Sequence, residues 1–407
     1  MPAALALALV AVSAVQAADI AVRGGTVYPV TGAPITDGVV VIRDGTIAAV
    51  GPAADVQIPA GMTVVEAAVV TPGLIDAHTV VGMAGYLNQE DDQDQLERSE
   101  AMQPELRAID AYNARAPLIE WLRGFGVTTI HSGHGPGEII SGQTLLAKTT
   151  GDTVAEAVFE PAAMVAATLG EGAVMAGDEG RKSPGNRSKV AAMLRAELLA
   201  ARAYLEQRDA AADDDDVEPP ARDLRKETLA EVLAGNMPLL VTVQRHHDIV
   251  TALRIAGEFG IRLVLDGAAE SYLLIDEIRA AGVPVILHPA MARASGEREN
   301  MAFTTAAKLV DAGIPVAFQS GYESYVPKTR VVLFEAAQTL PHGLSFEQAL
   351  AAVTIDAARI LGIEDRVGSI EVGKDGDLAL YDGDPFEYTS HAIGTIIEGV
   401  RVSKIER

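Results

Sequence analysis

Residues 71–82 read TPGLIDAHTVVG and combine a short apolar run with two side chains that can ligate a metal or transfer protons. Successive side chains of a β-strand point to opposite sides, so Asp76, His78 and Val80 are predicted to share one face. An aspartate and a histidine on one face resemble the start of a metal site, but valine has no ligating atom. The stretch therefore raises the question of whether this chain holds a catalytic metal.

Composition excludes several classes of function. The chain has 407 residues, enough for one large domain and a smaller one, and its net charge is −24. This acidity argues against nucleic acid and anionic membrane surfaces as partners, because both require basic patches. The chain has no cysteine, so disulfides, thiolate catalysis and Cys-ligated zinc are excluded. Aromatic residues are 4% of the chain, too few to predict a stacking platform for bases or sugars.

The beginning of the sequence is typical of an export signal. Residues 2–15 are apolar, residues 15–17 (VQA) resemble a cleavage site, and a polar segment follows. We therefore expect residues 1–17 to be a signal peptide and the mature protein to be periplasmic or secreted, with no attachment to a membrane. Arg23 is the first basic residue, so the signal lacks the usual basic start, and a buried apolar strand is the alternative.

The remaining sequence predicts an α/β fold in two parts. Short β-branched runs separated by Gly-Gly, Asp-Gly and Gly-Pro turns occupy both ends, which predicts one small β domain built from residues 18–70 and 362–407. Between them, residues 71–361 alternate strands and helices, which predicts a (β/α)8 TIM-type barrel. Strands are expected at 126–133, 237–244, 261–267, 283–289 and 314–321, and helices at 188–208, 222–234, 248–259, 271–281, 302–312 and 345–361.

Three charged segments interrupt this pattern. The acidic insertion 88–107 follows the first barrel strand and is expected to cover the active face, whereas the acidic run 211–220 is expected to be a solvated loop, with a calcium site as the alternative. Residues 181–187 (RKSPGNR) form the basic patch near the predicted barrel mouth. That patch could bind a substrate carboxylate, but salt bridges to the acidic insertions are the favoured interpretation.

The PGLID-x-H entry into the barrel and the segment 354–378, which contains GSIEVGKDGDL, resemble the amidohydrolase superfamily, and its imidazolonepropionase-like and prolidase-like branch most of all. The resemblance covers nearly the whole mature chain. It implies a barrel with a small β-sandwich domain formed by both terminal segments. It also implies hydrolysis in which one or two divalent metals, such as zinc, activate a water molecule.

The ligand positions implied by this resemblance are mostly filled by residues that bind metals poorly. His78 matches the first-strand histidine, but the other positions hold Val80, Thr242, Gly267 and Gly321, and the fourth-strand ligand cannot be assigned. Valine and glycine offer no ligating side chain, and a neutral hydroxyl is a poor substitute for imidazole. We therefore expect the familial metal site to be absent, with His78 as the one retained ligand.

Other polar residues follow the predicted strands and could build a different site at the same mouth. We predict His78, His131, His134 and His288 as acid/base groups, and substrate contacts from Gln143, Asp266, Gln319, Glu323, His246 and His247. Glu138 and Glu270 lie close behind them. Three alternatives remain open: a rebuilt metal site for zinc or another divalent ion, a metal-free polar pocket, or no functional pocket.

Two functions follow from these alternatives. The first is an exported hydrolase of C–N bonds in a small amide, cyclic amide or dipeptide-like substrate. The second is a catalytically inactive pseudoenzyme that acts as a periplasmic binding or scaffolding protein. A small molecule is the expected partner in the first case, and self-association into a homo-oligomer is open in both.

Overall fold

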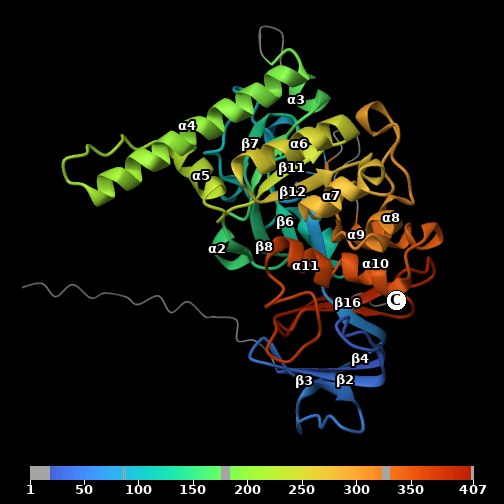
Figure 1. Ribbon diagram of the computed structural model, residues 1–407. Coiled ribbons are helices and arrows are strands. Elements are labelled where there is room, and N and C mark those ends of the chain that lie inside the picture. The colour runs from blue at the N-terminus through green and yellow to red at the C-terminus, as the bar shows by residue number, and fades with distance from the viewer. Residues whose placement is uncertain (1–18, 86, 88, 176–183, 323–330, 405–407) are drawn as a thin grey trace, which may run out of the picture.

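The computed structural model describes residues 19–85, 87, 89–175, 184–322 and 331–404. The predicted signal peptide and Glu323 lie outside these residues. Figure 1 shows the strands of residues 19–70 at one end of the molecule and the alternating strands and helices of the middle of the chain at the other. The mixed α/β fold predicted from the sequence is confirmed.

Both ends of the chain contribute to one seven-stranded sheet, in the order β17-β16-β15-β4-β1-β2-β3. Its strands are β1 Ile20–Val27, β2 Ile35–Arg43, β3 Thr46–Pro52, β4 Thr63–Pro72, β15 Leu378–Tyr381, β16 Ala392–Ile397 and β17 Val400–Lys404. The join is antiparallel and pairs Leu378 with Pro72 and Tyr381 with Val69. The two terminal segments therefore form one unit, although these strands are hydrogen-bonded as a single sheet and a sandwich stays a prediction.

The middle of the chain forms two further sheets. The first has six strands in the order β14-β13-β12-β11-β10-β7, and β10 to β14 run parallel. These strands are β7 Ile140–Gln143, β10 Val165–Thr168, β11 Leu239–Val243, β12 Leu263–Gly267, β13 Val285–Leu287 and β14 Val316–Phe318. The second, in the order β5-β6-β8-β9, contains β5 Leu74–Thr79, β6 Val127–Ser132, β8 Leu145–Lys148 and β9 Val158–Glu160.

The two middle sheets are joined at two places. A single bridge pairs Thr79 with Gly321, where the amide of Gly321 donates to the carbonyl of His78 at 3.1 Å. On the other side, only Thr144 separates β7 from β8 in the chain. The arrangement is that of a ring of strands with weak joints, and the described residues do not form one continuously hydrogen-bonded barrel.

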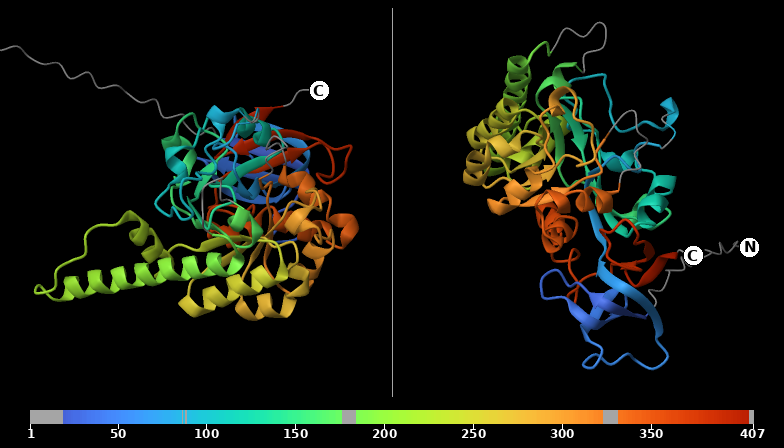
Figure 2. Two further views of the ribbon diagram at one scale, coloured as in Figure 1. Left: turned by 90° about the horizontal axis from the view of Figure 1, so that it is seen from above. Right: turned by 90° about the vertical axis from the view of Figure 1, so that its right-hand side faces the viewer.

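Helices cover the outside of this ring (Figures 1 and 2). They are α1 Pro117–Arg123, α2 Val154–Ala157, α3 Glu171–Met175, α4 Arg187–Asp213, α5 Leu224–Leu233, α6 His246–Phe259, α7 Ile275–Ala281, α8 Thr305–Asp311, α9 Val332–Ala337, α10 Phe346–Ala352 and α11 Ile355–Leu361. Within the described ranges, none of the helices is both long and apolar enough to cross a bilayer. The helix predicted over 345–361 is wrong as a single element, because the carbonyl of Val353 leaves the helical pattern and accepts from the amide of Ile75.

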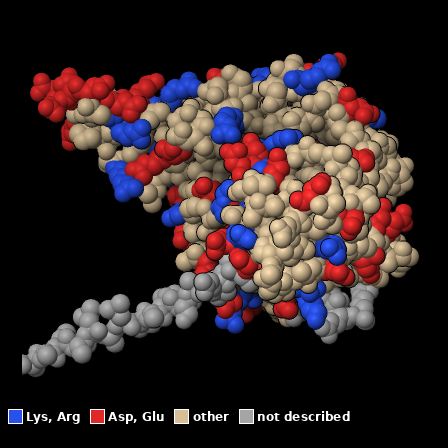
Figure 3. Space-filling model, turned by 90° about the horizontal axis from the view of Figure 1, so that it is seen from below, with Lys and Arg blue, Asp and Glu red and all other residues tan. Residues whose placement is uncertain are grey.

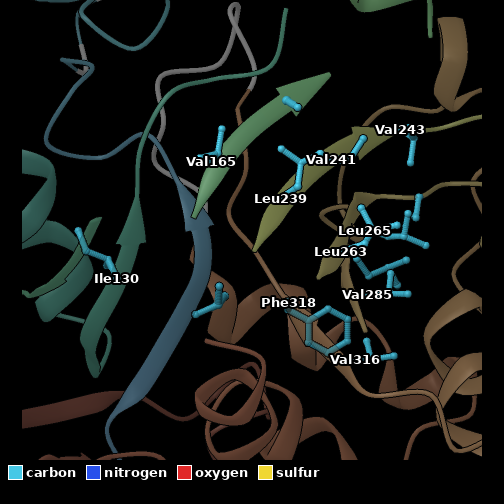
Figure 4. Close-up of a cluster of buried hydrophobic side chains, with 14 of the residues drawn as sticks. Ile130, Val165, Leu239, Val241, Val243, Leu263, Leu265, Val285, Val316 and Phe318 are labelled. Carbon is cyan, nitrogen blue, oxygen red and sulfur yellow. The ribbon is translucent and has the colours of Figure 1, made fainter. Parts of the chain in front are cut away.

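Alternation along the parallel strands separates two apolar cores. Outward-facing side chains such as Val241, Leu265 and Val285 pack toward the helices (Figure 4). Inward-facing residues form a second buried cluster at the centre of the ring: Ile75, Ala77, Leu146, Met164, Leu240, Val264, Ile286 and Ala317. This inner layer is the packing expected of a barrel interior, and it is the floor on which the polar residues stand.

Candidate active site

The candidate site is the layer directly above the inner apolar cluster. Side chains two residues apart in a strand point to the same side, so the residue two positions after each inward apolar residue also points into the ring. The pairs are Leu240 with Thr242, Val264 with Asp266, Ile286 with His288 and Ala317 with Gln319. A polar layer thus replaces the apolar one at the carboxyl ends of the parallel strands, where sites in α/β barrels are built.

Asp266 is the centre of this layer. Its Oδ1 is 3.0 Å from His78 Nδ1 and accepts from Gln319 Nε2 at 2.7 Å, and its Oδ2 accepts from the Thr242 hydroxyl at 2.5 Å. Burial would raise the pKa of this carboxyl, but His78 and the two neutral donors lower it below its ordinary value. Both oxygens of a buried carboxylate are therefore satisfied, which offsets the cost of removing the charge from water.

His78 is held by that carboxylate and keeps one nitrogen unused. An imidazole whose Nδ1 faces a carboxylate carries its proton there, so Nε2 presents a lone pair. Nε2 is buried and has no hydrogen-bond partner among the described residues, while the residue as a whole is 4% exposed. Burial alone would lower the pKa of His78, but Asp266, with Asp76 behind it, raises it above the ordinary value.

His288 is the second buried imidazole of the site. Its Nδ1 lies 3.0 Å from the carbonyl oxygen of Pro289, so it donates there, and its Nε2 has no partner in the described part of the chain. Burial lowers the pKa of His288 to about 4. This side chain is therefore neutral at physiological pH and offers a second lone pair.

A small cavity connects the two histidines. It has a volume of about 40 Å³. Its lining includes both imidazoles, Thr242, Asp266 and Gln319 at the strand ends, and Pro136, Arg298 and Tyr322 from loops. Because a water molecule needs roughly 10–15 Å³ of such space, the cavity can hold a few waters but not a dipeptide-sized ligand.

The other predicted histidines are used differently. His131 donates from Nδ1 to the carbonyl of Ala77 at 2.7 Å, and its Nε2 accepts from the Thr144 hydroxyl at 2.6 Å, so neither nitrogen faces the cavity. His134 is buried, and a Cβ added to Gly142 would lie 2.5 Å from its ring. His246 and His247 are exposed at the start of α6, where His246 Nδ1 lies 2.8 Å from Glu270. The structure does not bring these four side chains to the cavity.

One more predicted contact, Gln143, also lies elsewhere, and two contributors to the site were missed. Gln143 donates to the Thr228 hydroxyl and to the carbonyl of Pro104, each at 3.0 Å, and so joins two segments rather than facing the cavity. Thr242 was considered only as a poor metal ligand, although its position two residues after Leu240 indicated the polar layer. Arg298 lies in a loop, and no pattern in the sequence indicated that it would line the cavity.

Residues 181–187 were expected to pair with the acidic insertions. Within that stretch, Arg187 is described and pairs instead with Asp248 at 3.1 Å and Glu297 at 2.9 Å, and neither carboxylate belongs to those insertions.

At the cavity, the described residues offer few free donors for a divalent metal. His78 and His288 each present one unpartnered imidazole nitrogen there, whereas a catalytic zinc site takes three protein ligands, and both oxygens of Asp266 already accept from side chains. In the described ranges, no group of three or more histidine and carboxylate side chains is arranged to hold a metal ion.

Two of the ligand positions implied by the resemblance have a left-handed backbone. Gly267 has φ +78°, and a Cβ there would lie 2.4 Å from Gln244 Nε2; Gly321 has φ +69°. Side chains rarely adopt this left-handed conformation, so a histidine or an aspartate would be strained at these positions.

Comparisons with known proteins agree on the family. A family model described as "Amidohydrolase family" matches residues 245–403. An imidazolonepropionase of Solibacter usitatus is 27% identical over 386 residues, covering 88% of this chain and 88% of that protein. An imidazolonepropionase of Syntrophobacter fumaroxidans is 36% identical over a shorter stretch of 115 residues, 28% of this chain and 26% of its own length.

Solved structures give the same result. The crystal structure of an amidohydrolase from Thermotoga maritima MSB8 has a TM-score of 0.89 and 28% sequence identity, covering 95% of this chain and 100% of that one. A prolidase complexed with N-methylphosphonate-L-proline shares the fold, with a TM-score of 0.60 and 16% identity over 95% of this chain and 100% of its own. With the family model, the full-length relative and the Thermotoga structure in agreement, this chain belongs to the amidohydrolase superfamily, with imidazolonepropionases among its sequence relatives.

Proposed function

We propose that the protein hydrolyses a C–N bond of a small amide, cyclic amide or dipeptide-like substrate, and that His78 and Asp266 carry the reaction without the familial metal. The observation that supports this most directly is the unused Nε2 of His78, buried beside the cavity while Asp266 holds Nδ1. A histidine oriented by a carboxylate is a recurrent general base. The membership of a hydrolase superfamily supports the reaction class.

In this mechanism, Nε2 of His78 takes a proton from a water molecule as the water oxygen bonds to the carbonyl carbon. Asp266 stabilises the imidazolium that forms and is itself held by Thr242 and Gln319. The C–N bond then breaks, and the proton passes from Nε2 to the leaving nitrogen. His288, neutral near pH 7, accepts a hydrogen bond from the attacking water through its own Nε2. Because the base must be neutral, the rate should rise with pH through the raised pKa of His78.

The test is hydrolysis by the purified full chain of a panel of cyclic amides, N-acyl amino acids and Xaa-Pro dipeptides. We expect His78→Gln to lower kcat by about 100-fold or more, as loss of a general base does. His246→Gln is the matched control, since that side chain is exposed outside the cavity, and it should leave kcat unchanged. Activity that depends on a stoichiometric bound metal, or that survives in His78→Gln, would refute the mechanism.

A second candidate is a catalytically inactive pseudoenzyme that acts as a binding or scaffolding protein, and the small volume of the cavity is the observation that argues against turnover. About 40 Å³ holds water but no amide substrate, so the arrangement could be a relic of an active site. Absence of turnover across the panel, together with saturable binding of one of those amides by calorimetry, would support this candidate over the hydrolase.

Three broader assignments belong to the same proposal. The two middle sheets are interpreted as a distorted (β/α)8 barrel over residues 71–361, which the inner apolar layer and the bridge at Thr79 support. Residues 18–70 and 362–407 are interpreted as a composite β-sandwich domain. Export of a chain from which residues 1–17 are cleaved is proposed from the sequence pattern.

A further inference from the structure

The roof of the cavity is the long connection between β13 and α8, residues 288–304, called here the β13–α8 segment. It begins with His288 and Pro289, and Arg298 lies in its short helical turn, Gly296–Arg298. All three line the cavity together with the strand ends. A ligand larger than a few water molecules can therefore reach His78 only if this or another part of the lining moves.

One end of the helical turn is held by Glu297. Its carboxylate accepts from the amides of Glu171 at 2.7 Å and Gly172 at 3.3 Å, at the start of α3, and from Arg187 Nη2 at 2.9 Å. Arg187 also donates to Asp248 on α6 at 3.1 Å. A charged anchor therefore ties the segment to α3, α4 and α6.

A second polar anchor holds the residues on both sides of Glu297. Arg245 donates to Glu299 at 2.8 Å and to the carbonyl of Gly296 at 3.1 Å. Asn300 Nδ2 donates to Glu270 at 2.7 Å, and the Tyr272 hydroxyl donates to the carbonyl of Asn300 at 3.1 Å.

Apolar packing contributes little to the closed position. Met291 is 51% exposed, and Phe303 is 46% exposed with its ring stacked on His342. The buried apolar side chains of the segment are Pro289 and the small Ala290 and Ala292. Segments with few buried apolar contacts open at low free-energy cost. The ion pairs that remain lie partly in solvent, where each contributes little and salt weakens it.

We propose that the β13–α8 segment is a lid, closed by the Arg187–Glu297 and Arg245–Glu299 ion pairs, which opens locally to admit ligands to His78 and His288. Its role in substrate entry rests on the proposed function. The opening of the lid does not rest on the proposed function, because it depends only on the closed lid and its two anchors. High ionic strength and loss of either arginine shift the lid toward the open state.

The experiment measures modification of individual histidines by diethyl pyrocarbonate, followed by mass spectrometry of the full chain at pH 7. His288 is the reporter, since its unpartnered Nε2 faces the cavity. We expect Arg187→Met and Arg245→Met each to raise the modification rate of His288 about twofold to fivefold, the factor expected when a partly exposed ion pair is lost. In the double variant, the increase in the modification rate of His288 should approach the product of the two single increases. Adding 0.5 M NaCl should accelerate modification of His288 in the wild type, and should do so less in the double variant.

Arg279→Met is the matched control, because its ion pair with Asp276 lies on α7 outside the segment, and it should not change the rate. His131 is the internal control for unfolding, since it is buried and both ring nitrogens are hydrogen-bonded. Unchanged His288 rates in the double variant would overturn the lid. Parallel acceleration at His131 would also overturn it, because opening would then be unfolding of the barrel. Neither result depends on turnover, so an inactive protein could still have the lid.

Discussion

Asp266 shows how a single residue changes the character of the site. A carboxylate at this depth needs a donor for each oxygen, and His78, Thr242 and Gln319 supply them. The same hydrogen bonds commit both oxygens of Asp266 to side-chain partners. Asp76, which the alternation of β5 places near His78, instead accepts from the amide of Ser320 at 2.9 Å, and burial raises its pKa to about 7.

The buried histidines make stability sensitive to acid. Burial lowers the pKa of His134 to about 4, whereas an unfolded histidine titrates near 6.5. Between these values the unfolded state binds the extra proton, so the contribution of His134 to stability is complete above pH 6.5 and is lost as the pH falls toward 4. In the wild type, the free energy of unfolding should fall between pH 6.5 and pH 4. We expect this fall to be smaller in His134→Leu, by up to roughly 3 kcal/mol.

The measurement is urea denaturation of the wild type and of His134→Leu at several pH values. His391→Leu is the control, because that imidazole is partly exposed at 37% and pairs with Asp382 near the surface. A wild-type pH slope that persists unchanged in His134→Leu would show that His134 is protonated in the folded state or reaches water.

At the scale of elements, one buried lysine ties the four-stranded middle sheet to the terminal sheet. Lys148, at the end of β8, donates to Asp375 at 2.8 Å and to Asp377 at 2.6 Å, in the turn before β15, and its side chain is 4% exposed. Burial would lower the pKa of Lys148, but the two carboxylates raise it. Charges in this position are stable only as a set.

We therefore expect Lys148→Met to destabilise the protein by about 3–5 kcal/mol, because it leaves Asp377 buried without a cation and Asp375 paired with Arg366 alone. Chemical denaturation followed by circular dichroism measures the change. Lys226→Met removes a lysine from a partly exposed pair with Asp223 and should cost less than about 1 kcal/mol. Equal losses of stability in the two variants would argue against a special role for the buried ion pairs of Lys148.

At the scale of the whole molecule, charge is distributed unevenly. Helices α4 and α5 form an arm that projects from the body, and acidic side chains gather at its end (Figures 2 and 3). The run Asp213–Asp216 is exposed there, as expected of a solvated segment, although α4 extends to Asp213 and so includes its beginning. With a net charge of −24, repulsion within the chain opposes the compact state.

Screening should therefore stabilise the protein. Raising the ionic strength from 0.01 M to 0.2 M shortens the screening length from about 30 Å to under 10 Å. We expect the Tm to rise by about 1–3 °C, the shift that a gain on the order of 1 kcal/mol produces in a chain of this size. Scanning calorimetry in KCl measures it, and choline chloride at equal ionic strength should act alike. A Tm that falls with salt would mean that favourable ion pairs outweigh the repulsion.

Sequence by itself determined the family resemblance, the α/β class, the positions of β6 and of β11 to β14, and the polar residues that end the inward faces of β12 to β14. These depend on local patterns: alternation, turn residues and the TPGLIDAH stretch. Only the tertiary structure decided that Asp266 rather than Asp76 holds His78, that His131 is hydrogen-bonded on both sides, and that His288, Pro289 and Arg298 line the cavity. Asp266 and His78 lie 188 residues apart in the chain. Their contact is set by how sheets and loops pack against one another, and no local pattern encodes that packing.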